Sequence, residues 1–374
     1  MITSIKIDNF KSLVDFELSL SKFNCLVGLN GAGKSTVLQA LDFLSQLMIG
    51  DIEQWLKLRQ WENSDLNSKL TKKRNIDYIV TLDVEGKEVV WRGSFNRSSL
   101  RCVKESITED GEKILSVEDG SYIYESRSRD IVFEYQGSLL SVLKENQQGN
   151  TLREVKEAVK NIRSLDLISP ELLRSRTRYS DGKLGLGGEN LAAFIHESGT
   201  SVIKKLREKL MQVYPHIEEV KTKQLRAGWK QLEVTEVYDN TKITSGARHV
   251  NDGMLRLMAI LMQLDIGRAF LLFDEIENGI NPELIEYLID CLVDTADQIL
   301  VTTHSPMILN YLEDDVAKSG ITYLYKNKKG HTQAIKLFDI PSMAKKLQFM
   351  GPGEAFVDTD LSMLANEIFE IENS

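Results

Sequence analysis

One nine-residue stretch limits what this chain can fold into. Residues 28–36 read GLNGAGKST and match the pattern G-x-x-x-x-G-K-[ST] without a gap. The apolar run 23–27 before it predicts a short buried strand, and apolar residues at helical spacing from Lys34 to Met48 predict a helix after it. Glycines let backbone N–H groups turn inward, and a helix N-terminus adds its positive dipole end. The stretch therefore predicts a loop that holds a polyphosphate.

Within this loop, two side chains have distinct expected roles. Lys34 reaches the β- and γ-phosphates of a nucleotide, and the Ser35 hydroxyl contacts Mg²⁺. The residues expected to contact ATP here are Asn30, Gly31, Ala32, Gly33, Lys34, Ser35 and Thr36.

The composition excludes several other classes of protein. The three cysteines, Cys25, Cys102 and Cys291, lie far apart and show no zinc-ligand spacing, which favours a reducing compartment. The opening residues lack the charged-then-apolar pattern of a signal peptide, and no run approaches the 18 or so apolar residues of a membrane span. We therefore expect a cytoplasmic protein without a membrane segment.

The charge of the chain is unevenly distributed. The formal net charge of −9 argues against a surface coated in basic residues for nucleic acid. Residues 151–230, however, hold 16 Lys and Arg against ten Asp and Glu. Within them, Arg174, Arg176 and Arg178 alternate along an extended stretch, and Lys204 and Lys205 lie on a predicted helix. A solvated surface is one interpretation and a DNA-binding surface is the other.

The hydrophobic periodicity predicts an α/β chain in four parts. Residues 3–20 read as two strands around a turn at Asp8–Ser12, in which Lys11 is a solvated lysine or a nucleotide contact. Helical spacing returns at 51–70, and period-two alternation from 75 to 135 predicts an inserted antiparallel β lobe. The other two predicted parts are a mainly helical, net-basic insertion at 136–230 and a final part at 231–374. Two strands, 217–222 and 231–238, are predicted on either side of the boundary between these parts. A hairpin formed by 320–326 and 333–338 is predicted within the final part.

Gln136 follows a predicted strand, 131–135, and precedes a predicted helix, 139–144. A glutamine at such a junction can contact Mg²⁺ and the attacking water, so we count it among the metal candidates. The alternative is an N-terminal helix residue of no special role.

Asn251, Asp252 and Gly253 open a further predicted helix with a continuous apolar side. Asn251 is a good N-cap residue, and the helix N-terminus favours an anionic ligand. This triplet is therefore a second candidate nucleotide contact.

Two buried strands end in polar residues that carry chemistry. The run 270–273 is followed by Asp274 and Glu275, and the run 298–302 is followed shortly by His304. In P-loop enzymes the first carboxylate holds Mg²⁺, and the second can act as general base toward the attacking water. A histidine at the end of a neighbouring strand can donate to the γ-phosphate. Strand ends of this kind meet at one crevice.

Taken in this order, the stretches 28–36, 251–256 and 270–282 with His304 resemble an ABC-type ATPase. The opening residues 5–12 are similar to the N-terminal strand and turn of the SMC/RecF/OLD branch. The resemblance implies a P-loop NTPase with an ABC-ATPase head over residues 1–374, in which Asn251, Asp252 and Gly253 match the signature motif. The family form of that motif begins with serine, so Asn251 departs from it. Asn281 matches the D-loop, where transporters place aspartate.

The resemblance also implies a mechanism. Two heads form a homodimer around two ATP molecules, with Lys34 and Ser35 of one head facing Asn251 and Gly253 of the other. Glu275 acts as the base, His304 senses the γ-phosphate, and Mg²⁺ lies near Ser35 and Asp274. Small members of the branch are mostly prokaryotic and work with a separate nuclease or toxin in phage defence, which is an analogy of fold.

Four functions stay open at this point. The first is a dimeric switch ATPase that controls a partner effector. The second is a RecF-like DNA clamp that uses the basic residues of 151–230, the third is a transporter subunit, and the fourth is a nucleotide-binding scaffold. Asp358-Thr359-Asp360 also invites comparison with a metal-dependent nuclease, although the segment after His304 is short for such a domain.

Overall fold

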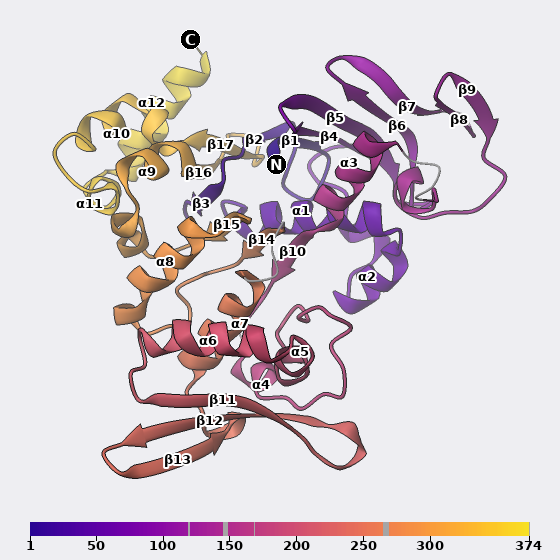
Figure 1. Cartoon of the computed structure of the whole chain (residues 1–374). Helices are drawn as coiled ribbons and strands as arrows, with labels where there is room; N and C mark the ends of the chain where they lie inside the picture. The colour runs from indigo at the N-terminus through magenta and orange to yellow at the C-terminus, as the bar shows by residue number, and fades with distance from the viewer. Residues whose placement is uncertain (119, 145–148, 168, 265–268, 374) are drawn as a thin grey trace. The chain divides into compact units, whose positions relative to one another are not determined.

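The computed structural model describes residues 1–118, 120–144, 149–167, 169–264 and 269–373, and Figure 1 shows the course of the chain. These residues fall into two compact units. Unit 1 comprises Met1–Arg163, Asp314–Gly351 and Ala355–Ser374, and unit 2 comprises Ser164–Glu313 and Pro352–Glu354. Strand β10 (Ile162–Leu165) spans the boundary between them in the sequence. In the described part of the chain, no helix has both the length and the apolar character needed to cross a membrane.

Unit 1 contains an eight-stranded antiparallel sheet in the order β2-β1-β4-β5-β6-β7-β8-β9 (Figure 1). Its strands are β1 (Ile2–Asp8), β2 (Phe16–Ser19), β4 (Asn75–Val84), β5 (Lys87–Asn96), β6 (Arg101–Glu109), β7 (Glu112–Glu118), β8 (Ser121–Tyr124) and β9 (Arg127–Asp130). Ile5 of β1 lies opposite Val80 of β4, which lies opposite Trp91 of β5. The strands expected in the 75–135 lobe therefore continue a sheet that begins with β1 and β2.

The predicted strand 131–135 is wrong. The polar residues of β9 pair with β8 instead, across a two-residue turn in which Glu125 and Ser126 both adopt positive φ. Such turns match the twist of a hairpin, so local turn geometry outweighs the apolar run that follows. Val132 consequently lies 89% exposed.

Two predicted helices are much shorter than expected. The expected helix at 139–144 is one 3-10 turn, Leu139–Ser141, and the helix at 51–70 is α2 (Ile52–Leu58) followed by a 3-10 turn, Asn63–Asp65.

Three further strands of unit 1 carry and flank the phosphate-loop stretch. Strand β3 (Phe23–Val27) pairs in parallel with β16 (Ile321–Lys326), which pairs antiparallel with β17 (Thr332–Lys336), as the predicted hairpin requires. The helices of unit 1 are α1 (Lys34–Ile49), α2, α3 (Asn150–Lys160), α9 (Asp314–Gly320), α10 (Pro341–Lys346), α11 (Pro352–Val357), which begins in unit 2, and α12 (Leu361–Asn373). Helix α3 buries Leu152, Val155 and Val159 and packs on β4, β5 and α1.

Unit 2 is built around α7 (Asp252–Leu264), in which every residue from Met254 to Leu264 is buried. Helices α4 (Pro170–Leu173), α6 (Thr200–Met211) and α8 (Ile285–Asp294) contact it. Strand β14 (Phe270–Phe273) pairs in parallel with β15 (Gln298–Thr302), and both are buried throughout. Short 3-10 turns, Pro282–Leu284 and Pro306–Tyr311, precede α8 and follow β15.

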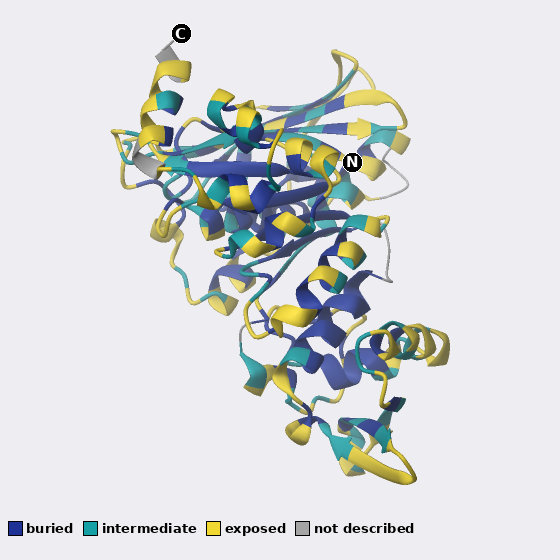
Figure 2. Cartoon of the chain, turned by 90° about the vertical axis from the view of Figure 1, so that its left-hand side faces the viewer, coloured by how far each residue is buried: buried dark blue, intermediate teal, exposed yellow. Residues whose placement is uncertain are grey.

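A three-stranded antiparallel sheet of unit 2 consists of β11 (Ile217–Gln224), β12 (Lys230–Tyr238) and β13 (Thr241–Gly246). Helices α5 (Leu191–Glu197) and α6 pack on β11. Strands β11 and β12 confirm the two predicted strands of this region, whereas β13 is an additional one. The sheet appears at the foot of Figure 2, where much of it is coloured intermediate or exposed.

One buried carboxyl group organises the interior of the large sheet. Glu105 of β6 is 3% exposed and accepts hydrogen bonds from the Trp91 indole at 2.7 Å, the Leu139 backbone N–H at 2.9 Å and the Ser138 hydroxyl. Burial raises the pKa of Glu105 above its usual value, against the effect of these donors. The group ties β5 and β6 to the turn that begins at Ser138.

Replacing Glu105 with alanine should destabilise the chain by roughly 3–5 kcal/mol, because three buried donors lose their acceptor at once. Chemical denaturation of both proteins measures this difference. The matched control is Glu118→Ala, which removes an exposed carboxylate of the same sheet that pairs with Lys104. That loss should stay within about 1 kcal/mol. Equal effects of the two substitutions would contradict the assigned role of Glu105.

Candidate functional site

The predicted phosphate loop of unit 1 has the expected strand–loop–helix geometry. Buried β3 ends at Val27, and α1 begins at Lys34. Gly28 and Gly33 adopt φ of 149° and 113°, and a Cβ at these positions would lie 2.3 Å from the Leu324 carbonyl oxygen and 2.4 Å from the Thr332 hydroxyl. Both positions therefore require glycine. Helix α1 has no acidic residue in its first turn, so its positive dipole end is available to an anion.

Lys34 is folded into the loop. Its side chain is buried, and the ammonium donates to the Gly28 carbonyl at 2.8 Å and the Leu29 carbonyl at 3.4 Å. Ser35, the next residue, is exposed. A bound polyphosphate would replace the carbonyl partners of Lys34 with charged oxygens, which make stronger hydrogen bonds. The loop therefore holds its lysine in place before a ligand arrives.

A threonine far along the chain supports the underside of this loop. The hydroxyl of Thr332 on β17 is fully buried, donates to the Ala32 carbonyl at 2.9 Å and accepts from the Lys326 ammonium at 2.8 Å. It also lies 2.9 Å from the Ser12 hydroxyl. Thr332 and Ala32 are 300 residues apart, and no local pattern in the sequence indicates their contact.

Lys11 is not a freely solvated lysine. Its ammonium donates to Gln39 Oε1 of α1 at 2.8 Å and lies 3.2 Å from the centre of the Trp61 ring. Burial, followed by the nearby charge of Arg59, lowers its pKa to about 8. Lys11 therefore packs against Trp61, and the prediction of a solvated lysine is wrong.

The carboxylates of unit 2 lie at the ends of the paired strands β14 and β15. The Thr302 hydroxyl donates to Asp274 Oδ1 at 2.5 Å and accepts from the Glu275 backbone N–H at 2.8 Å. Phe273 lies opposite Val301 in the parallel register, so the next residues on each strand meet. One hydroxyl thus positions both predicted acidic residues.

Glu275 occupies an unusual backbone conformation. Its φ is 47°, in the left-handed region that side chains other than glycine rarely adopt. The buried guanidinium of Arg256 donates to the Glu275 carbonyl at 2.7 Å and to the Asp274 carbonyl at 3.4 Å. Burial lowers the pKa of Arg256, while the surrounding carboxylates oppose that effect. Arg256 belongs to α7, so this helix holds the peptide that carries Glu275.

His304 lies beside Glu275. Its Nε2 is 3.6 Å from Glu275 Oε1, and both side chains are about 40% exposed. The His304 backbone N–H donates to Glu277 Oε1 at 2.7 Å. Unit 2 therefore brings together three predicted site residues, Asp274, Glu275 and His304. Sequence reasoning missed Thr302, Arg256 and Glu277, which position them.

The N-terminus of α7 is close to the loop after Glu275. Asn251 Oδ1 accepts from the Met254 backbone N–H at 2.8 Å, which confirms it as the N-cap. A Cβ on Gly253 would lie 3.1 Å from the Gly279 carbonyl oxygen and 3.8 Å from the Asn281 nitrogen. The triplet 251–253 and the loop that contains Asn281 are therefore neighbours in this unit.

Other predicted residues have structural partners. Gln136 Oε1 accepts from the Glu53 backbone N–H at 3.1 Å in the first turn of α2, and its contact with Mg²⁺ stays a prediction. Arg174 donates to the Val250 carbonyl at 3.0 Å and forms an ion pair with Asp252. Lys204 and Lys205 are exposed on α6, where Lys204 lies 3.8 Å from Glu208.

The donor set limits how a divalent cation binds. Among the residues that the structure describes, no three His, Cys, Asp or Glu side chains form a cluster able to hold a metal ion. Mg²⁺ usually takes one or two carboxylates from a protein and its remaining ligands from phosphates and water. The Ser35 hydroxyl of unit 1 and the Asp274 carboxylate of unit 2 are each an oxygen donor of a suitable kind, and their joint contact with the ion stays a prediction.

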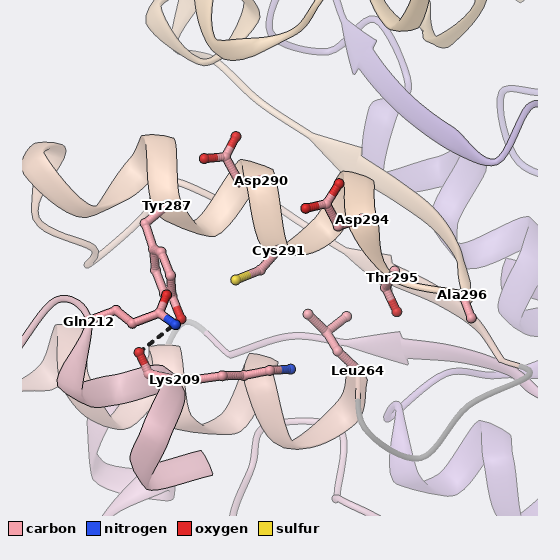
Figure 3. Close-up of a pocket in the computed structure, with 9 residues that line it drawn as sticks. All are labelled: Lys209, Gln212, Leu264, Tyr287, Asp290, Cys291, Asp294, Thr295 and Ala296. Carbon is pink, nitrogen blue, oxygen red and sulfur yellow. Dashed lines mark hydrogen bonds between the residues drawn. The ribbon is translucent and has the colours of Figure 1, made fainter. Parts of the chain in front are cut away.

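Unit 2 also contains a hollow of about 510 Å³ whose lining includes Lys209, Cys291 and Asp294. Figure 3 shows Cys291 and Lys209 facing it, while Asp290 and Asp294 point away from the thiol. Burial raises the pKa of the Cys291 thiol, which opposes formation of the reactive thiolate. We assign no chemistry to this hollow.

Comparison with known proteins identifies a matching family and one partial relative. A family model described as "AAA domain, putative AbiEii toxin, Type IV TA system" matches residues 23–310. An OLD nuclease of Thermus scotoductus is 33% identical over 101 residues, which span 27% of this chain and 17% of that protein.

Two solved structures of SMC heads are also similar. The head bound to the C-winged helix domain of ScpA matches with a TM-score of 0.57 and 14% identity, over 89% of this chain and 97% of that chain. The Pyrococcus furiosus head with an extended coiled coil, bound to the C-terminal domain of ScpA, matches with a TM-score of 0.51 and 16% identity, over 93% and 99%. The predicted P-loop, ABC-ATPase head fold is thereby confirmed.

Substituting Thr332 with valine should weaken nucleotide binding and cost about 1–3 kcal/mol of stability, because Ala32 and Lys326 lose a buried partner. Titration with a fluorescent ATP analogue and thermal unfolding measure the two effects. Thr322→Val is the matched control, since the Thr322 hydroxyl on β16 is buried without a hydrogen-bond partner among the described residues. A control that behaves like Thr332→Val would contradict the supporting role.

Substituting Thr302 with valine should lower the rate of ATP hydrolysis by about 10- to 100-fold, the usual cost of removing a group that orients a site residue. ATP affinity should change little, because the phosphate loop is untouched. Steady-state phosphate release and equilibrium binding separate the two quantities. The control is Thr303→Val, whose hydroxyl bonds to the backbone of Ser305. Unchanged turnover in Thr302→Val would show that Asp274 and Glu275 need no such positioning.

Proposed function

We propose a switch mechanism for this chain, which belongs to the AAA-domain family whose model matches residues 23–310. It is an ATPase related to SMC heads and to an OLD nuclease. In the proposed mechanism, two copies bind ATP between them, close, and open again after hydrolysis. The observation that carries the proposal is the Glu275–His304 pair. Its carboxylate and imidazole lie 3.6 Å apart, and Arg256 and Thr302 hold the Glu275 peptide.

In this mechanism each residue of the chain has one task. Lys34 leaves the loop carbonyls and contacts the β- and γ-phosphates. Glu275 accepts a proton from the attacking water, and His304, whose Nε2 lies 3.6 Å from Glu275 Oε1, donates to the γ-phosphate. Ser35 and Asp274 are the residues that would hold Mg²⁺, which would offset the negative charge of the phosphates.

Dimerisation completes the proposed site. Helix α7 begins in the triplet Asn251, Asp252 and Gly253, and Asn251 caps it by accepting a hydrogen bond from the Met254 backbone N–H. In the proposed dimer this end of α7 faces the γ-phosphate held by the loop of the second copy. Gly253 packs against the loop that follows Glu275. Contact between the N-terminus of α7 and the nucleotide of the second copy would therefore affect the position of Glu275. Asn251 in place of the family's serine would set how tightly the two copies close.

We also propose that the switch controls a separately encoded effector, a nuclease or a toxin, in cytoplasmic defence against phage. The support is indirect: the family description names a toxin system, and one relative is an OLD nuclease of which this chain matches a small part. Nucleotide-dependent co-purification with the product of a neighbouring gene would support this role. Full protection against phage by this chain expressed alone would contradict it.

The substitution Glu275→Gln should lower phosphate release by about 10²- to 10⁴-fold, since it removes the general base while keeping the shape of the side chain. With ATP and Mg²⁺ the variant should accumulate as a dimer, which native mass measurement detects. Glu283→Gln, an exposed acid in the turn before α8, is the control and should behave like the unaltered protein. Normal hydrolysis by Glu275→Gln, together with a dimer that forms regardless of nucleotide, would identify a constitutive scaffold instead.

A further inference from the structure

The turn between β11 and β12 carries an exposed aromatic residue among arginines. The turn runs from Leu225 to Trp229 and is closed by a hydrogen bond from the Leu225 N–H to the Trp229 carbonyl at 2.7 Å. Within it, Ala227 adopts φ of 60° and Gly228 φ of 82°. Trp229 is 40% exposed, so part of its indole is open to solvent.

A second segment of unit 2 runs beside this turn. The Lys230 backbone N–H donates to the Thr177 carbonyl at 2.9 Å, and this bond places the flanking arginines next to the indole. The guanidinium of Arg178 lies 5.2 Å from the centre of the Trp229 ring. Arg176 lines an open hollow of about 560 Å³ together with Leu225, Arg226 and Trp229. The hollow is thus lined by two apolar residues and two arginines.

Arg176 also lines a second hollow, of about 230 Å³, with Arg174, Arg248 and His249 among its other lining residues. The two hollows therefore adjoin at one side chain. Arg174 is already paired with Asp252. For Arg176, Arg226 and Arg248, the described residues include no ion-pair or hydrogen-bond partner to the side chain, and no aspartate or glutamate lines either hollow. This part of an acidic protein presents three uncompensated guanidinium groups.

We propose that this surface, which we call the turn face (residues 174–178, 225–229 and 247–249), binds single-stranded nucleic acid. One base stacks on Trp229 over Leu225, and the backbone phosphates on either side contact Arg176, Arg226 and Arg248. Stacking on an aromatic side chain within a positively charged groove is the usual chemistry of single-strand binding. A duplex keeps its bases stacked on one another and offers no free ring face to the indole.

The turn face extends beyond the proposed switch. It uses none of the residues assigned to ATP, and all of its residues belong to unit 2. The turn face differs from the set of basic residues that the sequence suggested for DNA binding. It includes Arg176 and Arg178 from that set but not Lys204 and Lys205. Its additional residues are Trp229, Arg226 and Arg248.

The test is fluorescence anisotropy with a labelled 20-nucleotide single strand and with the same strand annealed to its complement, using the full chain without ATP. The single strand should bind about tenfold more tightly or better. If three phosphates are neutralised, log K should fall with log salt with a slope of about −2. Equal affinity for the duplex would overturn the proposal. So would equal displacement of the strand by polyglutamate, which would identify a site for an acidic protein.

Substitutions separate stacking from charge. Trp229→Ala should weaken single-strand binding by about five- to 150-fold without changing the salt slope, while Trp229→Phe should retain most of the affinity. Arg176→Ala and Arg248→Ala should each reduce the slope by about 0.7. Lys205→Ala, an exposed basic residue of α6, is the matched control and should bind within about twofold of the unaltered protein.

Two measurements keep these outcomes interpretable. Thermal unfolding of each variant shows whether it folds, and Trp229→Phe covers the case in which Trp229→Ala does not. Unchanged binding in Trp229→Ala would overturn the stacking contact. Because binding is measured without ATP, it is expected to persist in Lys34→Ala, so failure of the switch mechanism and failure of the turn face give different results.

Discussion

The parallel pairing of β14 with β15 is the constraint on which the chemistry of unit 2 depends. The register sets Phe273 opposite Val301, so the chain leaves both strands at the same edge. There a single hydroxyl, that of Thr302, contacts both Asp274 and the Glu275 peptide. Arg256 reaches the same peptide from α7. The hydrogen-bonded pairing of two buried apolar strands thus brings Thr302 close to Asp274 and Glu275.

The phosphate loop of unit 1 follows the same logic with different chemistry. Its glycines allow the backbone to approach β16 and β17 closely, and Thr332 fills the position where a side chain on Gly33 would clash. In both units a threonine hydroxyl on a neighbouring strand supports the functional segment. A hydroxyl suits this position because it donates and accepts at once in little space.

The sequence was most informative where a motif consists of consecutive residues. The loop at 28–36, the carboxylates after β14 and the N-cap at Asn251 were all predicted, because each motif is local and its residue types have few other uses. Thr332, Arg256 and Thr302 were missed, since each acts across a long separation in the chain and looks like an ordinary core residue in sequence. The contact between Lys11 and Trp61 was hidden for the same reason.

Predictions of regular structure failed where short-range geometry competed with apolar periodicity. The run 131–135 has the composition of a strand, yet the tight turn at Glu125 and Ser126 had already paired 127–130 with β8. Neither the hydrophobic pattern nor strand propensity predicts that residues 127–130 pair with β8. The exposure of Trp229 was equally hidden, because a tryptophan beside a strand is usually counted as core.

The left-handed backbone of Glu275 has a consequence for how this protein would change under selection for stability alone. A non-glycine residue in that region costs roughly 1–2 kcal/mol relative to glycine, so the most stable residue at this position is one that has no carboxylate. Selection for heat resistance alone would therefore favour variants in which glycine replaces Glu275 and the carboxylate is lost. If Glu275 is the base of the proposed mechanism, glutamate at this position in a related chain would indicate retained hydrolysis, and glycine or asparagine there would indicate its loss.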